Sequence, residues 1–445
     1  MALSAKTKQF LLCMGDALIF YAALIAMLMI RYGAPLAAEF FNIHIIPFTA
    51  ILPLWIIIFY IGGLYEPRAL KTNVAFLNRY AASVGAAALF AALLFYFVPF
   101  FGITPRINLF IFLGLVVMLG ALWRTLFNRL LAAGAPPARL LILDENDVVR
   151  ALIPHLADNP QLGYEVRAHL KGGLDDPLFP PLGELITREN ITTIVIPAHL
   201  KKQSRAARAI YKQLVLGIEV TDLADLYESI FKKVPLDELE EVWFLENIAK
   251  RHRIYETLKR PIELALAILF LPLLVPLTLL TGIYLLLIAG LPLIYTQTRV
   301  GQHARVFTLY KFRTMRPDAE TQGPRWADEQ DARTIPGAAL IRAMHLDELP
   351  QIWNILRGDL SIVGPRPERP EFTEGLRKEI PYYNLRHLIR PGVTGWAQVN
   401  YRYGRTAEDA YEKLQFDIYY LKHRSLTLDV LIVLRTARLL VANIR

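Results

Sequence analysis

The chain has 445 residues, 54% of them hydrophobic, and its mean hydropathy of +0.33 is above what a soluble globular protein needs. The single cysteine, Cys13, excludes a disulfide framework and a cysteine-based metal site. The net charge is +9, but the basic residues flank hydrophobic runs and form no nucleic-acid motif. Anionic lipid and phosphorylated substrates are therefore the expected partners, not nucleic acid.

Four apolar runs predict a bundle of membrane helices, at 9–31, 46–64, 80–99 and 107–127. Each is close to the ~20 residues that a hydrocarbon core of about 30 Å requires. Cations gather before the first run, between the second and third, and after the fourth, so the positive-inside rule places both ends of the bundle in the cytoplasm. These cations are Lys6, Lys8, Arg68, Lys71, Arg79, Arg124, Arg129 and Arg139. Asp16 is the one acid within the first run, where it serves either a function or helix packing.

A linker at Pro136-Pro137 leads into a region where predicted strands and helices alternate, which indicates a small parallel α/β unit of Rossmann type. The strands are expected at 139–144, 192–198 and 218–223, and the helices at 146–157 and 203–216. The first strand is followed by Asp144-Glu145-Asn146-Asp147 in place of a glycine-rich turn. Three acids there would repel a pyrophosphate, so we expect no NAD at this turn.

A charged connecting segment, 231–258, precedes a fifth apolar run at 259–295, which Pro272 and Pro276 interrupt near its middle. Proline removes a helix hydrogen bond and kinks the helix. Cations flank both ends of the run, which favours a broken helix that enters the membrane and returns to the same face; a plain fifth span is the alternative. Helices are expected further on at 374–389 and 407–423, and at 426–444 an amphipathic helix that lies on the membrane or packs in a core.

Asp347 and Glu348 are adjacent acids followed by LPQIWNILRG, which has the apolar spacing of a short helix. We expect Asp347 at the N-cap, Pro350 in the first turn and Gly358 just beyond the end. Basic residues surround the acids in sequence, at Arg342, Arg357, Arg366 and Arg369. Acids among many cations suit a carboxylate nucleophile or metal ligand beside a phosphorylated substrate. An ordinary solvated helix cap is the alternative.

Three motifs occur in the order YKFRTM (310–315), LDELPQIWNILRGDLSIVGPRP (346–367) and RPGVTGWAQVNYRYG (390–404). Together they resemble the bacterial sugar transferase family, the monotopic polyprenyl-phosphate phosphoglycosyl transferases. The resemblance covers roughly 255–445, and the whole chain resembles the larger members of the class.

The resemblance implies a membrane α-helical bundle, a Rossmann-like α/β domain and a mainly α monotopic catalytic domain. Their predicted bounds are 1–134 for the bundle, 135–230 for the Rossmann-like domain, 231–258 for a linker and 259–445 for the catalytic domain. It also implies a re-entrant membrane helix at about 261–290, with Pro276 at the family's Ser-Pro break. Val275 replaces that serine here.

The reaction that the resemblance implies joins a nucleotide sugar to a lipid phosphate. Asp347 would attack the β-phosphorus of a UDP-sugar and expel UMP, and undecaprenyl phosphate would then attack the aspartyl intermediate. Glu348 would hold Mg²⁺ against the diphosphate. This is the initiating step of exopolysaccharide or related envelope glycan synthesis, on the cytoplasmic face of the bacterial inner membrane. Larger members of the class suggest a homodimer.

Further roles carry over residue by residue from the same motifs. Arg342 matches an arginine near the phosphates, and Lys311 matches an active-site lysine, with Arg313 a weaker candidate. Arg366 matches an arginine that contacts phosphate and nucleotide, and Pro365 and Pro367 would fix its loop. The motif RPGVTGWAQVNYRYG leaves two alternatives open for Trp396 and Gln398. These residues either shape the site or pack in the core.

The segment before the acids departs from the family pattern. Ala338 replaces a glycine, Ala339 a basic residue, and Ala343-Met344-His345 a Lys-Thr-Ser-like triplet. His345 is either a proton shuttle or only a replaced residue at the helix entry. These departures favour a competing hypothesis, a catalytically inactive membrane scaffold or regulator of polysaccharide assembly. A polytopic glycosyl transferase or flippase would need more spans and an Asp-rich loop. The intact Asp347-Glu348 pair favours the enzyme.

Overall fold

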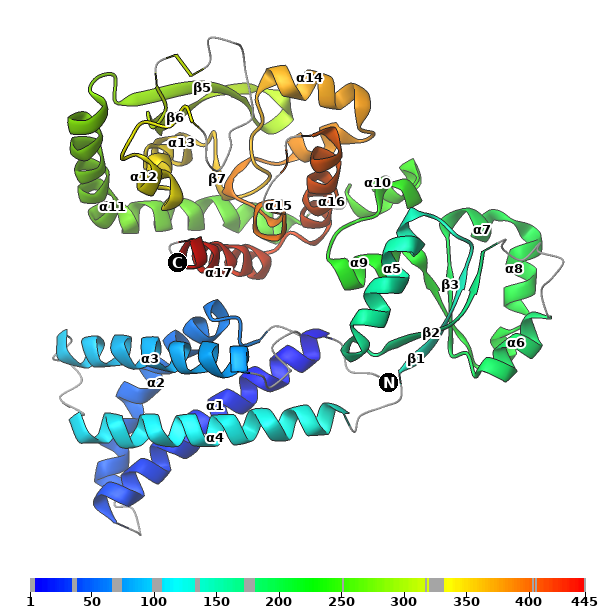
Figure 1. Ribbon diagram of the computed structural model, residues 1–445, viewed down its shortest axis with the longest axis horizontal. Helices are drawn as coiled ribbons and strands as arrows, with labels where there is room; N and C mark the ends of the chain where they lie inside the picture. Colours follow the sequence, from blue (N-terminus) through cyan, green and yellow to red (C-terminus); the bar gives the residue numbers. More distant parts are fainter. Residues whose placement is uncertain are drawn as a thin grey trace. The chain divides into compact units, whose positions relative to one another are not determined.

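The computed structural model describes residues 5–33, 38–65, 74–97, 106–132, 137–171, 181–249, 252–316, 318–319, 332–401, 404 and 406–443 (Figure 1). The chain forms two compact units. The first comprises Met1–Glu145, Val149–Ile194 and Ala209–Glu219, and the second comprises Asn146–Val148, Val195–Arg208 and Val220–Arg445.

Four helices begin the first unit, as the apolar runs predicted: α1 (Ala5–Tyr32), α2 (Ala38–Ile61), α3 (Val74–Phe97) and α4 (Arg106–Ala132). Within them, Gln9–Tyr32, Glu39–Ile61 and Asn108–Phe127 are long and apolar enough to cross a membrane. The apolar stretch of α3, Arg79–Phe95, is shorter. The four predicted helices are therefore present, and three of them are long and apolar enough to cross a membrane. Of the cations in the positive-inside argument, Arg68 and Lys71 lie outside the described residues, and Arg124 lies within the span Asn108–Phe127, not after it.

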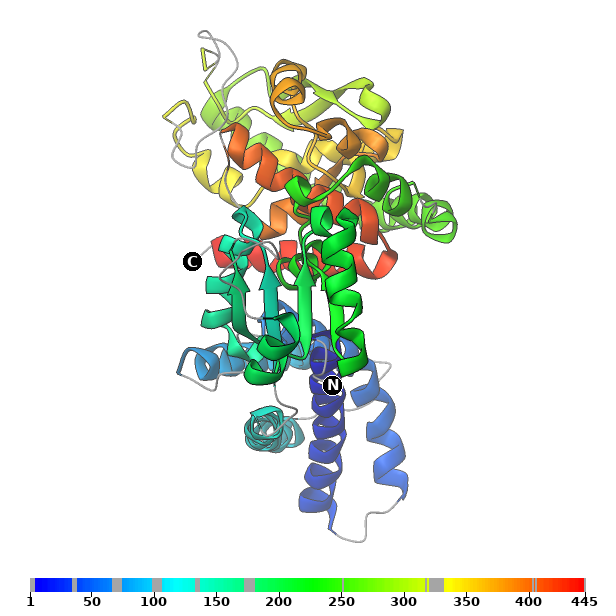
Figure 2. The same cartoon turned by 90° about the vertical axis from the view of Figure 1, so that its right-hand side faces the viewer.

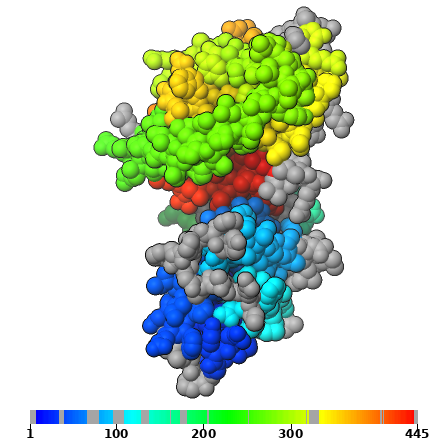
Figure 3. All heavy atoms as spheres, turned by 90° about the vertical axis from the view of Figure 1, so that its left-hand side faces the viewer, coloured from blue at the N-terminus to red at the C-terminus, as the bar shows by residue number. Residues whose placement is uncertain are grey.

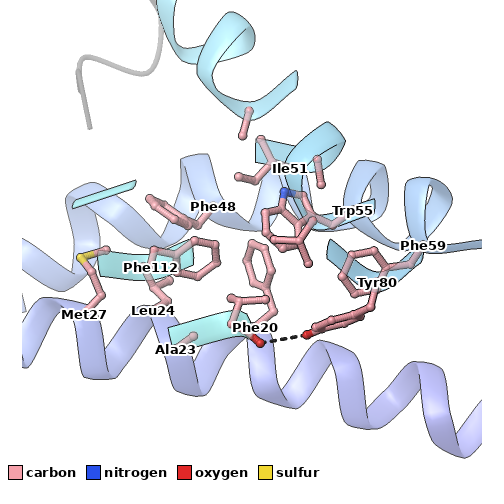
Figure 4. Close-up of a cluster of buried hydrophobic side chains, with 14 of the residues drawn as sticks. Phe20, Ala23, Leu24, Met27, Phe48, Ile51, Trp55, Phe59, Tyr80 and Phe112 are labelled. Atoms are coloured by element: carbon pink, nitrogen blue, oxygen red, sulfur yellow. Dashed lines mark hydrogen bonds between the residues drawn. The ribbon is translucent and has the colours of Figure 1, made fainter. Parts of the chain in front are cut away.

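Aromatic side chains fill the core of this bundle (Figure 4). The Phe112 ring lies 5.0 Å from both Phe20 and Phe48 and 5.7 Å from Trp55, measured between ring centroids. The three pairs meet edge to face, the geometry that aromatic quadrupoles favour. The dashed line in Figure 4 marks the bond from the Tyr80 hydroxyl to the Val116 carbonyl oxygen, 3.0 Å long.

Asp16 pairs with Arg124 across the bundle. The Arg124 Nη2 to Asp16 Oδ2 distance is 2.5 Å, and the two side chains are 4% and 9% exposed. Arg124 also donates through Nη1 to the Leu64 carbonyl oxygen at 2.6 Å. The pair therefore ties α1 and α4 to the chain that follows α2, which supports the helix-packing role for Asp16.

A four-stranded sheet follows, built from β1 (Ala138–Leu143), β2 (Tyr164–Leu170), β3 (Thr193–Ile196) and β4 (Glu219–Asp222), in the order β2-β1-β3-β4. β1 and β2 pair in parallel, with Ala138 opposite Tyr164, and Figure 2 shows the strand arrows side by side. The helices of this region are α5 (Asp147–Asp158), α6 (Leu182–Glu189), α7 (Ala198–Lys202), α8 (Ser204–Tyr211) and α9 (Leu223–Phe231).

The predicted parallel sheet is confirmed, but the sequence analysis overlooked β2. This strand alternates Glu165, Arg167 and His169 with smaller or apolar residues, as suits an edge strand with one side in water. The helix expected at 203–216 ends at Tyr211, and a 3₁₀ turn, η5 (Leu214–Leu216), follows it. Gly217, at φ 73°, ends that turn because glycine adopts the left-handed conformation at little cost.

The second unit holds the helices α10 (Glu241–Asn247) and α11 (Arg253–Ala289) and an antiparallel hairpin, β5 (Ile294–Val300) with β6 (Val306–Phe312). The remaining elements are α12 (Ala339–Ala343), η8 (Leu346–Gln351), α13 (Ile352–Arg357), β7 (Ser361–Val363), α14 (Pro370–Glu379), η9 (Tyr383–Leu388), β8 (Gly392–Thr394), α15 (Trp396–Asn400), α16 (Ala407–His423) and α17 (Leu426–Asn443). The helices expected at 407–423 and 426–444 are confirmed. The single helix expected at 374–389 is wrong, because α14 ends at Glu379 and the separate turn η9 follows.

α11 has 37 residues and contains Pro261, Pro272 and Pro276. In Figure 1 it runs across the view above α17 and then turns upward at its far end. It is the fourth helix long and apolar enough to cross a membrane. Its outer side chains are exposed, Leu273 by 65% and Leu287 by 79%, and Figure 3 shows the helix as a green band on the surface. A continuous apolar surface of this kind suits contact with lipid.

α16 is the central helix of the second unit. Eight consecutive residues, from Leu414 to Leu421, are buried, so this stretch of the helix contacts protein on every side. Thr406 and Asp409 form a capping box at its start, in which the side chain of each accepts the backbone N–H of the other.

We predict that Arg124→Ala destabilises the protein by about 3–5 kcal/mol, because it leaves the Asp16 carboxylate buried without its partner. The thermal unfolding midpoint in detergent measures the effect. Replacing both partners by uncharged residues should recover most of the loss. Arg150→Ala, at a side chain that is 64% exposed, is the matched control, and equal midpoints for Arg124→Ala and this control would contradict the prediction.

Candidate active site

Asp347 and Glu348 lie in the 3₁₀ turn η8, directly before α13. The turn begins before the acids, because His345 adopts a left-handed φ of 54° and its carbonyl oxygen accepts the Glu348 N–H at 3.1 Å. The prediction that Asp347 is the N-cap is therefore wrong, and His345 occupies that position. Gly358, at φ 94°, ends α13 as predicted.

The Glu348 carboxylate brings together two cations that are distant in sequence. Lys311, from β6, donates to Oε1 of Glu348 at 2.6 Å, and Arg366 donates through Nη2 to the same oxygen at 3.0 Å. The Glu348 side chain is 10% exposed and that of Lys311 17%, whereas the Arg366 side chain is 42% exposed. Charge-assisted bonds of this length are among the stronger ones in proteins.

These contacts favour the ionised form of Glu348. Burial raises the pKa of the carboxyl group, but the charges of Lys311 and Arg366 outweigh burial and hold the pKa well below its usual range. Burial lowers the pKa of Lys311 by more than the charge of Glu348 raises it. The charge of Glu348 raises the pKa of Arg366. The two cations together therefore keep Glu348 an anion at every pH of biological interest.

Asp347 has a different environment. Burial raises its pKa, and the adjacent Glu348 raises it further, while Lys311, His345 and Arg342 act in the opposite direction. Within the part of the chain that the structure describes, no side chain donates a hydrogen bond to the Asp347 carboxylate. A carboxylate that is surrounded by positive charge but not bonded to it retains its oxygen lone pairs for an incoming electrophile.

The other predicted cations are placed differently. Arg342, on α12, donates through Nη1 to the Thr334 hydroxyl at 2.6 Å and affects Asp347 only through its charge. Arg313 donates through Nη2 to the carbonyl oxygens of Ala289 and Gly290, at 2.5 and 3.1 Å. It therefore satisfies carbonyls at the end of α11, where a cation is favourable, and its substrate role stays a prediction.

Arg366 stands on a loop that closely packed glycines hold in place. A Cβ added to Gly392 would lie 2.1 Å from the Gly364 nitrogen, so neither strand end tolerates a side chain there. The Gly392 N–H donates to the Pro365 carbonyl oxygen at 2.9 Å. Arg299 donates through Nη1 to the Pro367 carbonyl oxygen, also at 2.9 Å. Both prolines that flank Arg366 are thus fixed by bonds to their carbonyl groups.

α11 is joined to the strand that leads into this loop. Lys259 donates to the carbonyl oxygen of Val363, the last residue of β7, at 2.7 Å. Glu263 accepts the backbone N–H of Ile362 at 3.0 Å and the hydroxyl of Ser361. Pro276 lies further along the same helix, and the break expected there stays a prediction.

The sequence analysis missed Arg386, which supports the Arg366 loop from behind. Arg386 is 6% exposed and donates through Nη2 to the Arg366 carbonyl oxygen at 3.1 Å. The same guanidinium contacts Asp417 of α16 at 2.9 Å and the Tyr383 hydroxyl at 2.8 Å. One signal could have revealed the pair, because Asp417 is a lone acid inside the apolar segment LQFDIYYL.

Trp396 packs in the core, one of the two alternatives that the motif left open. It is 3% exposed, stacks on Tyr419 at 5.7 Å between ring centroids, and donates through Nε1 to the Lys232 carbonyl oxygen at 2.8 Å. Gln398 donates to the Val393 carbonyl oxygen at 3.0 Å. Both residues thus support the fold behind the loop.

The family model described as "Bacterial sugar transferase" matches residues 254–443. A putative undecaprenyl-phosphate N-acetylgalactosaminyl 1-phosphate transferase from Bacillus subtilis is 44% identical over 140 residues, which cover 32% of this chain and 78% of the relative. The chain belongs to the bacterial sugar transferase family.

Two further relatives show how far the family likeness extends. The UDP-N-acetylgalactosamine-undecaprenyl-phosphate N-acetylgalactosaminephosphotransferase of Aeromonas hydrophila is 39% identical over 221 residues, half of this chain and 52% of the relative. This chain thus spans about half of that relative's length. The UDP-glucose:undecaprenyl-phosphate glucose-1-phosphate transferase of Xanthomonas campestris is 28% identical over 344 residues, 73% of this chain and 71% of the relative. With apolar helices at its N-terminal end, this sugar transferase is one of the large members of the family.

We predict that Arg386→Met lowers transferase activity about 100-fold, because small displacements of a positioning loop are costly to catalysis. It should also cost about 3–5 kcal/mol of stability, since it leaves Asp417 buried without a counter-charge. Activity assays and thermal unfolding measure the two effects.

The double variant Arg386→Met/Asp417→Leu separates the two roles. Removal of both charges should restore most of the stability while the Arg366 carbonyl remains without its donor, so activity should stay low. Recovery of activity together with stability would show that Arg386 serves only the fold.

Proposed function

We propose that this sugar transferase moves a sugar 1-phosphate from a UDP-sugar to undecaprenyl phosphate, with release of UMP, through a covalent intermediate on Asp347. The observation that carries the proposal is the contrast between the two acids: Glu348 is bonded to Lys311 and Arg366, while Asp347 beside it has no such bond. The relatives from Xanthomonas and Aeromonas, whose names describe undecaprenyl-phosphate transferases, support the same class of reaction.

In the first step, an Asp347 oxygen attacks the β-phosphorus of the UDP-sugar. The bond between that phosphorus and the oxygen bridging the two phosphates breaks, and UMP leaves with the bridging oxygen. The sugar phosphate remains on Asp347 as an acyl phosphate. In the second step a phosphate oxygen of undecaprenyl phosphate attacks the same phosphorus and releases the Asp347 carboxylate. The product is undecaprenyl-diphospho-sugar, and two displacements at one phosphorus balance all atoms and charges.

The cations around the acids suit the charge of this reaction. A diphosphate adds negative charge to a site that already holds two carboxylates, and phosphoryl transfer is accelerated mainly by positioning and by stabilisation of such charge. Arg366 is the most exposed of the cations at Glu348, and its fork of donors matches phosphate oxygens. Lys311 and Arg342 lie close enough to affect the pKa of Asp347 through their charges.

We also propose that Glu348 holds Mg²⁺. Among the described residues no group of three acids, histidines or cysteines could bind a metal ion by itself. Mg²⁺ bound with nucleotides takes only one or two carboxylates and completes its shell with phosphate oxygens and water. Lys311 and Arg366 both bond to Oε1 of Glu348, which leaves Oε2 as a ligand. When bound, the ion would neutralise charge on the diphosphate.

The membrane setting follows from the same proposal. Undecaprenyl phosphate lies in the bilayer and a UDP-sugar in the cytoplasm, so the site belongs at the cytoplasmic face of the inner membrane. A plain crossing by α11 would separate the bundle's cytoplasmic ends from the catalytic residues. We propose that α11 enters the bilayer and returns, with Pro272 and Pro276 near the turn.

The altered segment 338–345 is compatible with activity. Ala338 is fully buried and packs with Ile341 and Leu285, so the change from glycine affects the core behind the site. His345 is exposed and occupies the N-cap position of η8. Neither change removes the bonds at Glu348 or the free carboxylate of Asp347. We therefore favour the enzyme over the inactive scaffold.

The first test is UMP release by the full chain in nanodiscs supplied with undecaprenyl phosphate, Mg²⁺ and a panel of UDP-sugars. Asp347→Asn should lower release by about 1,000-fold or more, because an amide is not a nucleophile. Glu374→Gln, an acid-to-amide change on the exposed side of α14, is the matched control and should keep full activity. If folded protein released no UMP with any sugar of the panel, the result would favour the inactive scaffold.

The pH dependence supplies a second prediction. The reaction needs ionised Asp347, whose pKa is raised above its usual value, so the rate should fall as the pH falls through that raised pKa. Lys311 lowers this pKa by its charge, so Lys311→Met should move the acid limb of the normalised rate profile to higher pH. Lys311→Arg retains the charge and should leave the limb in place. An unchanged limb in Lys311→Met would assign it to another group.

A further inference from the structure

A cluster of exposed apolar side chains lies at the end of α8 and on the turn η5. Tyr211 is 73% exposed, Leu214 46%, Val215 91% and Leu216 54%. Single exposed apolar residues are ordinary, but four within six positions on a folded domain indicate an interaction surface. We call these four residues the apolar turn.

The apolar turn lies at the edge of the sheet where the parallel strands begin. It directly precedes β4, whose first residue, Glu219, donates its N–H to the Thr192 carbonyl oxygen at 3.0 Å. Thr192 in turn donates its N–H to the Arg139 carbonyl oxygen, also at 3.0 Å. The starts of β4, β3 and β1 are therefore neighbours, and the turn shares this edge with Ala138, the first residue of β1.

This edge is tied to the membrane by a short piece of chain. α4 ends at Ala132, beyond its candidate span Asn108–Phe127, and β1 begins six residues later at Ala138. Six residues reach at most about 20 Å when fully extended. The start of β1, at the edge that carries the apolar turn, therefore lies within reach of the membrane end of α4. The opposite edge, after Leu143 and Leu170, lies at the other end of the strands.

The side chains around the turn suit a lipid headgroup layer. Arg208, on α8, and Lys212, which directly follows α8, are both exposed and lie on either side of Tyr211 in sequence. A hollow next to the turn is lined by Thr187, Arg188, Lys212 and Gln213, with Glu184 as the acid among its walls. Arg188, which is 66% exposed, pairs with Glu189 at 3.1 Å, and no ion pair is seen for the exposed Arg208 and Lys212 among the described residues. Tyrosine and aliphatic residues beside cations are typical of segments that lie in the membrane interface.

We propose that the apolar turn and its two flanking cations, Arg208 and Lys212, dock on the surface of a bilayer that contains anionic phospholipid. The docking holds the α/β domain against the membrane that the helices of the first unit cross. This surface is independent of the proposed transfer reaction, because none of its residues belongs to the candidate active site.

The test uses the full chain in nanodiscs of phosphatidylcholine with phosphatidylglycerol, in a Cys13→Ser background. A polarity-sensitive fluorophore is attached at Val215→Cys and, as the matched control, at Lys171→Cys. Lys171 is 72% exposed and follows β2 at the opposite edge of the sheet. Nitroxide-labelled lipid and aqueous iodide serve as competing quenchers.

The fluorophore at position 215 should be quenched several-fold more by the nitroxide lipid than the one at 171, and less by iodide. Replacing phosphatidylglycerol by phosphatidylcholine, or introducing Arg208→Glu with Lys212→Glu, should weaken the lipid quenching at 215. Equal quenching at the two positions would overturn the proposal. A label at 215 that is shielded from both quenchers would overturn it as well, because a second copy of the chain or another protein would then cover the turn.

Discussion

The contact on which the candidate site depends is the pair of bonds that Lys311 and Arg366 make to one oxygen of Glu348. It joins three segments: the hairpin strand β6, the turn η8 and the loop that carries Arg366 between Pro365 and Pro367. Two cations beside one buried acid leave a positive excess, which stabilises a neighbouring carboxylate and attracts phosphate. Asp347 occupies that field without being bonded into it, so the same arrangement that fixes Glu348 keeps Asp347 available.

The loop that carries Arg366 is held in place by contacts on its buried side. Gly364 and Gly392 bring two chain segments closer than any side chain would permit, and Arg386 holds the Arg366 carbonyl from the buried side. Arg386 is itself held by Asp417, in the middle of the most buried helix of the unit. Burial of such an ion pair costs free energy unless its hydrogen bonds are satisfied. The Arg386–Asp417 pair therefore fits a role in positioning the Arg366 loop better than a role in stabilising the fold.

Polar contacts also organise the two apolar parts of the molecule. In the bundle, Asp16 and Arg124 form a buried pair, so an acid that would be unfavourable in lipid becomes a link between helices. In α11, Lys259 and Glu263 bond to β7 and its neighbours, and Leu285 is buried near the other end, while outer side chains such as Leu273 and Leu287 are apolar and exposed. Both ends of α11 are therefore held by the protein on one side, and the outer surface of the helix is suited to lipid.

The sequence alone predicted the four apolar helices, the parallel sheet, the central and terminal helices α16 and α17, and the motifs that identify a sugar transferase. These features depend on local periodicity and on contiguous residues, so they can be recognised in the sequence itself. Only the tertiary structure showed that Lys311 and Arg366 meet on Glu348, that Arg313 is used at the end of α11, and that Arg386 supports the loop. Such contacts join residues up to 37 positions apart at the site itself, and spacing in sequence does not encode them. The N-cap was wrongly predicted at Asp347 for the same reason, because the left-handed turn at His345 depends on its surroundings and a non-glycine residue there gives no local signal.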